Sequence, residues 1–161
     1  MAEENRNLAK QTYDTLCAAL DGENWKYRRD DDNFLVEYSV GGEDLPMGFT
    51  CHVDAEHQLV RLLSPMPLTV KEEQRLDVAV AVSLINDKLV NGCFDFNLLN
   101  GELCFRMCNS FCDSVLGAEV FLYMLAVSIH TVEQFNDKLF MLATGAVTIE
   151  KFVDLLSEIV D

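Results

Sequence analysis

The chain has 161 residues, and its 27 acidic and 12 basic side chains give it a formal net charge of −15. This charge repels a nucleic-acid backbone and excludes nucleic-acid binding as a function. A chain of this length buries about 70% of the surface that its unfolded form exposes, so we expect residues 1–161 to form a single domain. The acidic excess is present in both halves of the sequence and indicates either simple solubility or attraction to a basic partner segment.

The N-terminal sequence MAEENRNLAK has neither the basic start nor the apolar run of a secretory signal. The longest uninterrupted apolar run, residues 120–127, is far shorter than the roughly 18 residues of a membrane span. We therefore expect a cytoplasmic protein without a membrane partner. In that compartment its six cysteines should be reduced thiols.

The first half of the sequence predicts one helix followed by a β-meander. Apolar residues recur at helical spacing over residues 5–20, and Asp21-Gly22 ends the pattern. From Trp25 the apolar period changes to two, which predicts three or four antiparallel strands up to about Leu63. The intervening turns are predicted at residues 29–33, 41–46 and 54–57.

The second half predicts a helix, a hairpin and two further helices. Ser64-Pro65-Met66-Pro67 should break the sheet, and Thr69 with Glu72 resembles a capping box that opens a helix running to about Val90. Because this helix is apolar over much of its girth, we expect other layers to enclose it. After the hairpin, a long helix should begin at Ser114 or Gly117 and end near Gly145, and Thr148 should cap a final amphipathic helix that includes Ile159 and Val160.

The hairpin is the strongest local signal and occupies residues 92–107, GCFDFNLLNGELCFRM. Taking Asn100-Gly101 as a two-residue turn predicts three apolar pairs on one face: Leu98 with Leu103, Phe96 with Phe105, and Phe94 with Met107. The opposite face then places Asp95 against Arg106 and Cys93 against Cys108. These last four residues are our candidate partner-binding residues.

The predicted fold is α+β, in the order α-βββ(β)-α-ββ-α-α, with helices covering one face of an antiparallel sheet. A set of apolar strand residues needs cover on this interpretation: Phe34, Val36, Tyr38, Phe49, Cys51 and Val53. Either strand twist brings them under the second helix, or a second subunit covers them. We favour the second subunit and hence a homodimer.

The sequences INDKLVNGCFDF and NGELCFRM, together with this order of elements, resemble the YbjN-like family of small bacterial proteins. The resemblance spans nearly the whole chain and implies the fold of the type III secretion chaperones. It also implies a non-enzymatic, often dimeric cytoplasmic protein with a regulatory role in sensory transduction, and it carries over no catalytic residues. The chain departs from a minimal secretion chaperone, because two helices follow the second hairpin.

For each group of residues that could support chemistry, a structural role is the better interpretation. The spacing Cys104-x3-Cys108-x3-Cys112 would place three thiols on one face of a helix, but on a strand Cys104 and Cys108 lie about 13 Å apart, too far to share a metal ion. The three histidines are dispersed, and Asp30-Asp31-Asp32 suits a solvated turn. We therefore predict no catalytic residues, metal or cofactor.

The sequence thus favours a binding module, a homodimer that captures a partner segment by sheet-edge addition or in an apolar groove beside the third helix. One alternative is a type III secretion chaperone proper. Another is a thiol-based redox sensor that uses the cysteines of the second hairpin, which would require an accessible thiol of low pKa.

Overall fold

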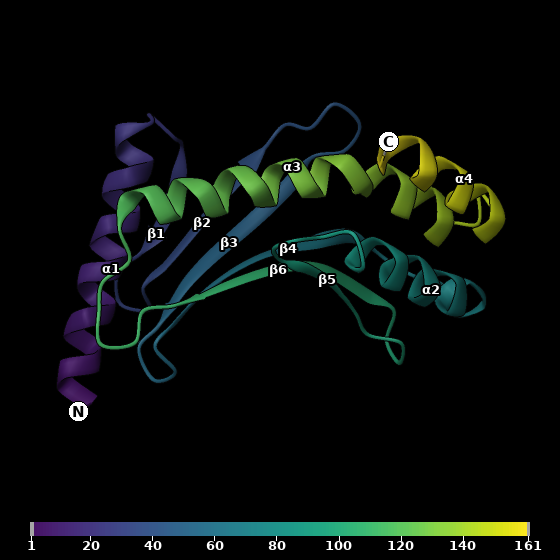
Figure 1. Cartoon of the computed structure of the whole chain (residues 1–161). Helices are drawn as coiled ribbons and strands as arrows, with labels where there is room; N and C mark the ends of the chain where they lie inside the picture. Colours follow the sequence, from purple (N-terminus) through teal and green to yellow (C-terminus); the bar gives the residue numbers. More distant parts are fainter. Residues whose placement is uncertain (1, 161) are drawn as a thin grey trace.

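The structure, a computed structural model, describes residues 2–160, with side chains described for residues 3–158. This part of the chain forms an α+β fold of four α-helices, one 3-10 helix and six strands (Figure 1). In chain order they are α1 (Ala2–Gly22), β1 (Tyr27–Asp30), β2 (Leu35–Val40), β3 (Met47–Asp54), β4 (Leu59–Thr69), η1 (Glu72–Gln74), α2 (Arg75–Asn86), β5 (Cys93–Phe96), β6 (Glu102–Ser110), α3 (Ala118–Ala143) and α4 (Ile149–Val160). The predicted fold class is confirmed.

The six strands form one antiparallel sheet in the order β1-β2-β3-β4-β6-β5. Side chains alternate between its two faces, as the period of two predicts. One row across the sheet is fully buried and consists of Val36, Cys51, Leu62 and Met107. The neighbouring row points the other way and consists of Thr50, Leu63, Arg106 and Cys93. We call the face of this second row the open face.

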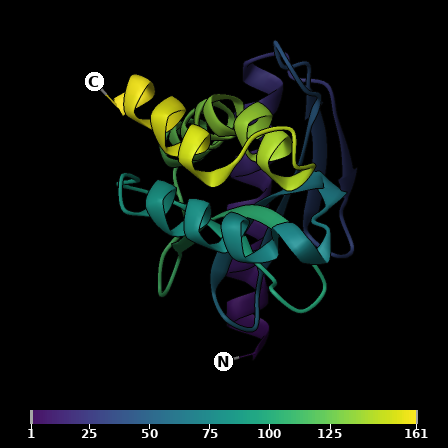
Figure 2. The same cartoon turned by 90° about the vertical axis from the view of Figure 1, so that its right-hand side faces the viewer.

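The helices cover the buried face of the sheet. The long helix α3 crosses the sheet, and α1 lies at the end formed by β1, β2 and β3 (Figure 1). At the other end α2 packs on β5, and α4 lies beside α2 (Figure 2). None of the described helices is both long and apolar enough to cross a membrane.

The apolar strand residues for which we favoured cover by a second subunit all lie on the helix side. Phe34, Val36, Tyr38, Phe49, Cys51 and Val53 are each at most 7% exposed. They lie under α1 and α3, and the ring of Tyr13 from α1 packs 5.5 Å from that of Phe34. Our expectation that the second helix or a second subunit covers them was wrong, so these residues give no support to a dimer.

The second helix begins later than predicted, because the sheet continues through the prolines. Strand β4 runs to Thr69, which pairs with Glu102 and is therefore unavailable as a helix cap. The prolines lie at a bulge between Pro65 and Thr69, where a missing N–H is tolerated. Only the short η1 and the twelve-residue α2 follow.

Helix α2 is also not enclosed on all sides. A row at four-residue spacing faces outward, with Leu76 72%, Val80 50% and Leu84 36% exposed. Its opposite side is buried against β5, α3 and α4. We call Leu76, Val80 and Leu84 the α2 row.

The hairpin register differs from the predicted one by two residues. Phe94 pairs with Phe105 and Phe96 with Leu103, so the connection is longer than a two-residue turn. Asn97 decides this: its side-chain Oδ1 accepts the N–H groups of Leu99 and Asn100, and its carbonyl accepts the N–H of Gly101. Because the shift is even, the strand residues keep their predicted faces, but Leu98 lies in the turn and is 46% exposed.

Asn86 at the end of α2 closes the outer edge of the sheet. Its side chain accepts the N–H of Phe94 at 2.8 Å and donates to the carbonyl of Phe94 at 3.0 Å. These are the groups that an added strand would use on the edge strand β5. This contact gives Asn86 a structural role, and it disfavours strand addition at this point.

The last two helices begin and end as predicted. Gly117 is the N-cap of α3, and Gly145 takes the left-handed conformation after it, with φ +77°. The Thr148 Oγ accepts the N–H of Lys151 at the start of α4. Phe152 and Leu156 of α4 are buried, while the side chains of Ile159 and Val160 lie outside the described residues.

Candidate functional site

The four candidate partner-binding residues gather around one guanidinium on the open face. Arg106 of β6 bonds to both carboxylate oxygens of Asp95 in β5, at 2.5 and 3.0 Å. The same guanidinium lies 3.4 Å from the Cys93 sulfur and 3.9 Å from the Cys108 sulfur. The shifted register places Cys93 opposite Arg106 and Cys104 opposite Asp95, so the predicted rungs were wrong although Asp95 and Arg106 do meet.

This cluster is half exposed. The Arg106 and Asp95 side chains are 42% and 48% accessible, and Cys108 is exposed. The hydrogen bonds from Arg106 lower the pKa of Asp95, so the carboxylate is charged at neutral pH. The arrangement can present a fixed ion pair and two thiols to a docked surface.

The two half-buried thiols of the hairpin, Cys93 and Cys104, have raised pKa values. Burial, followed by the charge of Asp95, raises the pKa of Cys93 despite the nearby guanidinium. Burial also raises the pKa of Cys104, and that of Cys51 to about 12. Because nucleophilic cysteines need a lowered pKa, Cys93 and Cys104 give no support to the redox-sensor alternative.

All six cysteines are unpaired. Cys93 and Cys108 are not cross-strand partners, which removes the one pair for which the predicted register gave disulfide geometry. Within residues 2–160, no three side chains of metal-binding type come close enough together to hold an ion.

Two shallow hollows on the open face could not be found from the sequence. One, of about 440 Å³, is lined by residues that include Arg28, Gly48, Thr50 and Pro65. The other, of about 560 Å³, lies between residues 65–69 and 102–104. The two hollows share Pro65, and the second one lies at the β4 bulge. Sequence reasoning missed them because it ended the strand before Pro65.

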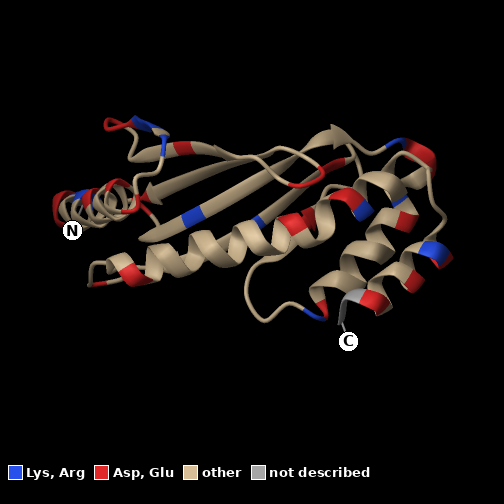
Figure 3. Ribbon diagram, turned by 90° about the horizontal axis from the view of Figure 1, so that it is seen from above, with Lys and Arg blue, Asp and Glu red and all other residues tan. Residues whose placement is uncertain are grey.

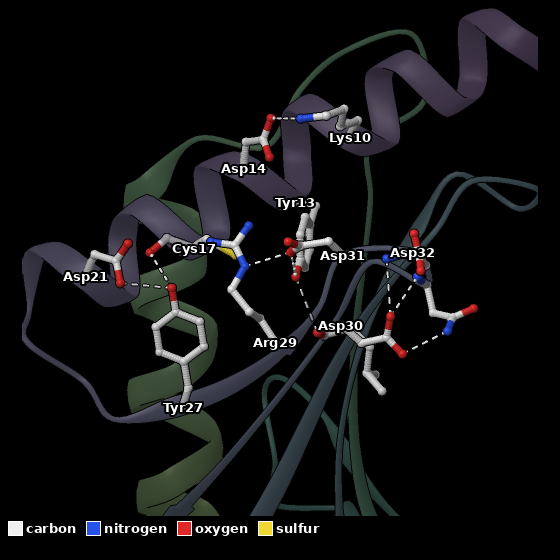
Figure 4. Close-up of polar contacts among 12 residues, drawn as sticks. Lys10, Tyr13, Asp14, Cys17, Asp21, Tyr27, Arg29, Asp30, Asp31 and Asp32 are labelled. Atoms are coloured by element: carbon white, nitrogen blue, oxygen red, sulfur yellow. Dashed lines mark hydrogen bonds and ion pairs between the residues drawn. The ribbon is translucent and has the colours of Figure 1, made fainter.

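A polar network joins α1 to the β1–β2 turn (Figure 4). The Tyr13 hydroxyl donates to Asp31 at 2.8 Å, and the Arg29 Nε donates to the same oxygen at 2.6 Å. The Tyr27 hydroxyl donates to Asp21 of α1 at 2.8 Å. Asp30 instead accepts bonds from Asp32 and Asn33 within the turn. The acidic triplet thus divides between separate structural roles, as expected for a turn.

The histidines are dispersed, as predicted. His52 lies on the open face beside Arg61, and His130 is exposed on α3. His57 bonds through its Nδ1 to the Asp54 carboxylate at 2.9 Å, in the turn after β3. Asp54 also pairs with Arg61, so this cluster ties the β3–β4 turn together.

Acidic residues are distributed over the helices and loops along the chain (Figure 3). Basic side chains are fewer and lie between them. The distribution agrees with a global negative field.

Comparison with known proteins identifies the family. The YbjN family model, described as "Putative bacterial sensory transduction regulator", matches residues 12–141. The chain belongs to the YbjN family. The predicted family resemblance is confirmed, and the match runs from the middle of α1 to near the end of α3.

A solved crystal structure shares the YbjN fold. It is described as YbjN, "a putative transcription regulator from E. coli", and is 16% identical to this chain, with a TM-score of 0.58. The match covers 83% of this chain and 92% of that one. A comparison with curated proteins gives no match.

Proposed function

We propose that this YbjN-family protein is a non-enzymatic cytoplasmic regulator that acts by binding a protein partner on the open face of its sheet. The observation that carries the proposal is the face itself: within residues 2–160, the helices lie on one side of the six-stranded sheet and none lies on the other. It presents the Asp95–Arg106 pair at its β5 end and the two hollows along β3, β4 and β6. The net charge of −15 favours a partner whose contacting surface is basic.

Arg106 is the centre of the proposed contact, and replacing it tests the proposal. Tagged wild-type protein in a native bacterial extract should retain one or a few proteins in stoichiometric amount. The Arg106→Ala variant should retain about tenfold less, because Asp95 and the thiols lose the group that orders them. The measurement is quantitative mass spectrometry of the eluate.

Lys88→Ala is the matched control, since Lys88 is an exposed basic residue on the loop after α2, away from the open face. It should retain the partner at the wild-type level. Urea unfolding of both variants checks that the fold is intact. Equal retention by Arg106→Ala and wild type, or no stoichiometric protein at all, would contradict the proposal.

We further propose that the protein is a homodimer whose subunits meet along the α2 row. Residues at four-residue spacing form a straight ridge, and two copies of such a ridge pack antiparallel about a two-fold axis. Centring this pair on Val80 places Leu76 against Leu84 of the partner subunit.

Sedimentation tests the dimer with a charge placed at its centre. Val80→Glu should convert the dimer to a monomer, because the two-fold axis brings two buried carboxylates together. Val90→Glu is the control, as Val90 is 100% exposed just beyond α2 and should leave the dimer unchanged. A wild-type protein that sediments as a monomer, or a Val80→Glu variant that stays dimeric, would refute this interface.

A further inference from the structure

The chain contains two asparagine–glycine pairs, one on each side of strand β5. Asn91-Gly92 ends the loop between α2 and β5, and Asn100-Gly101 lies in the hairpin turn. An asparagine that precedes glycine is prone to lose its side-chain amide, because glycine has no side chain to shield its main-chain nitrogen. The two pairs share this local chemistry, so their surroundings decide whether each one reacts.

The fold restrains both residues of the pair in the hairpin turn. The N–H of Gly101 donates to the carbonyl of Asn97, and its carbonyl accepts the N–H of Val70, each at 2.8 Å. The Asn100 side chain accepts the main-chain N–H of Glu102 at 3.0 Å and donates to the Glu102 carboxylate at 2.8 Å. Gly101 is also buried. The main-chain nitrogen and the side-chain amide are therefore both held in place.

The pair before β5 is not restrained in this way. The N–H of Asn97 bonds to Glu102, and alternation along the strand then turns the N–H of Gly92 away from β6. Within residues 2–160 the Gly92 N–H has no hydrogen-bond partner. Asn91 is exposed, and its Nδ2 donates to the Tyr123 hydroxyl at 3.0 Å. This contact holds the amide nitrogen of Asn91 and leaves the nitrogen of Gly92 free.

The fold requires glycine at position 92. Gly92 has φ +76°, in the left-handed region that favours glycine. A Cβ atom at this position would also overlap the ring of Phe105, which is buried in the core. An unshielded main-chain nitrogen therefore follows Asn91 as a consequence of how the loop enters β5.

We propose that Asn91 is a site of spontaneous deamidation in the folded protein. A base in the solvent takes the proton of the Gly92 N–H, and this nitrogen forms a bond to Cγ of Asn91. The bond between Cγ and Nδ2 breaks, and Nδ2 leaves as ammonia with a proton from water. Water then opens the resulting succinimide ring to aspartate or isoaspartate, so each event replaces a neutral amide by a carboxylate.

The isoaspartate product adds one methylene to the main chain between α2 and the edge strand β5. Asn86 at the end of α2 bonds to both main-chain groups of Phe94, so these bonds span the altered link. The Phe105 ring leaves no room for added atoms beside Gly92. We therefore expect the modification to loosen the Asn86 contact and to expose the outer edge of β5.

Peptide mapping by mass spectrometry tests the site, with the full chain incubated in mildly alkaline buffer at physiological temperature. Folded protein should deamidate at Asn91 at least about tenfold faster than at Asn100, because reaction at Asn100 first requires several hydrogen bonds to break. In urea the two sites should react at similar rates, because both lose their surroundings. Asn91→Gln should remove the main product, since the longer side chain no longer closes the same ring.

Amide hydrogen exchange tests the effect on the sheet edge. Protein enriched in the isoaspartate form should exchange the Phe94 N–H several-fold faster than fresh protein, whereas Asn91→Gln incubated for the same time should not change. Equal rates at Asn91 and Asn100 in folded protein, or reaction at Asn91 only in urea, would overturn the assignment of the site. Unchanged exchange at Phe94 in the isoaspartate form would overturn the effect on β5.

Discussion

Replacing Phe105 by alanine should destabilise the protein by about 3–5 kcal/mol, the usual cost of removing a buried aromatic ring. Phe105 is 0% exposed in the middle of β6, and its ring packs edge-on at 5.3 Å against that of its cross-strand partner Phe94. The truncation leaves a cavity between the sheet and the helices. Urea unfolding at neutral pH measures the loss.

Leu98→Ala is the informative control for this prediction. Leu98 lies in the hairpin turn and is 46% exposed, so its truncation should change the free energy of unfolding by less than about 0.5 kcal/mol. In a hairpin with a two-residue turn, Leu98 would face Leu103 in the core. A loss of about 2 kcal/mol or more at Leu98 would therefore show that the register described above is wrong.

Asp54→Ala should cost about 3 kcal/mol at neutral pH, because it removes a buried carboxylate that accepts two main-chain and two side-chain hydrogen bonds. The side chain accepts the N–H groups of Glu56 and His57 at 3.0 Å each, and it also binds the His57 ring and Arg61. The turn between β3 and β4 loses its polar core. Urea unfolding of wild type and variant gives the difference.

The effect of Asp54 should depend on pH in a defined direction. Burial alone would raise the pKa of Asp54, but the hydrogen bonds from His57 and Arg61 outweigh it and hold the pKa well below its usual range. A lowered pKa in the folded state means that the contribution is complete above the unfolded value of about 3.9 and is lost as the pH falls below it. The gap between wild type and Asp54→Ala should therefore narrow below about pH 4.

Glu56→Gln controls for charge in the same turn. Glu56 is exposed, and only its main-chain N–H reaches Asp54. It should unfold like wild type at every pH. A gap between wild type and Asp54→Ala that stays constant from pH 7 to pH 3 would show that Asp54 does not titrate with a lowered pKa.

Local chemistry made much of the fold predictable. Helix α3 was located from a glycine at each end, and the start of α4 was located from Thr148, because these residues act on the backbone beside them. The faces of the hairpin strands were predicted because alternation survives an even shift in register. The short apolar runs predicted that no described helix crosses a membrane, because this property does not depend on contacts between distant residues.

The predictions that failed concerned residues that suit two different local structures. Thr69 suits a helix cap and also suits a strand, and pairing with Glu102 of β6 decided for the strand. Asn100-Gly101 suits a two-residue turn, but the side chain of Asn97 stabilised a longer one. The candidate site shows the same division: the contact between Asp95 and Arg106 was predicted, whereas their cross-strand partners were not.

By itself, the sequence determined the family, the α+β class, the order of the elements and the ion pair between Arg106 and Asp95. These follow from backbone preferences and from side chains close together in a hairpin. The tertiary structure decided which face of the sheet is covered, that α2 leaves Leu76, Val80 and Leu84 exposed, and that Asn136 of α3 is buried. Such properties depend on which distant surfaces compete for the same apolar face, and one sequence does not encode them locally.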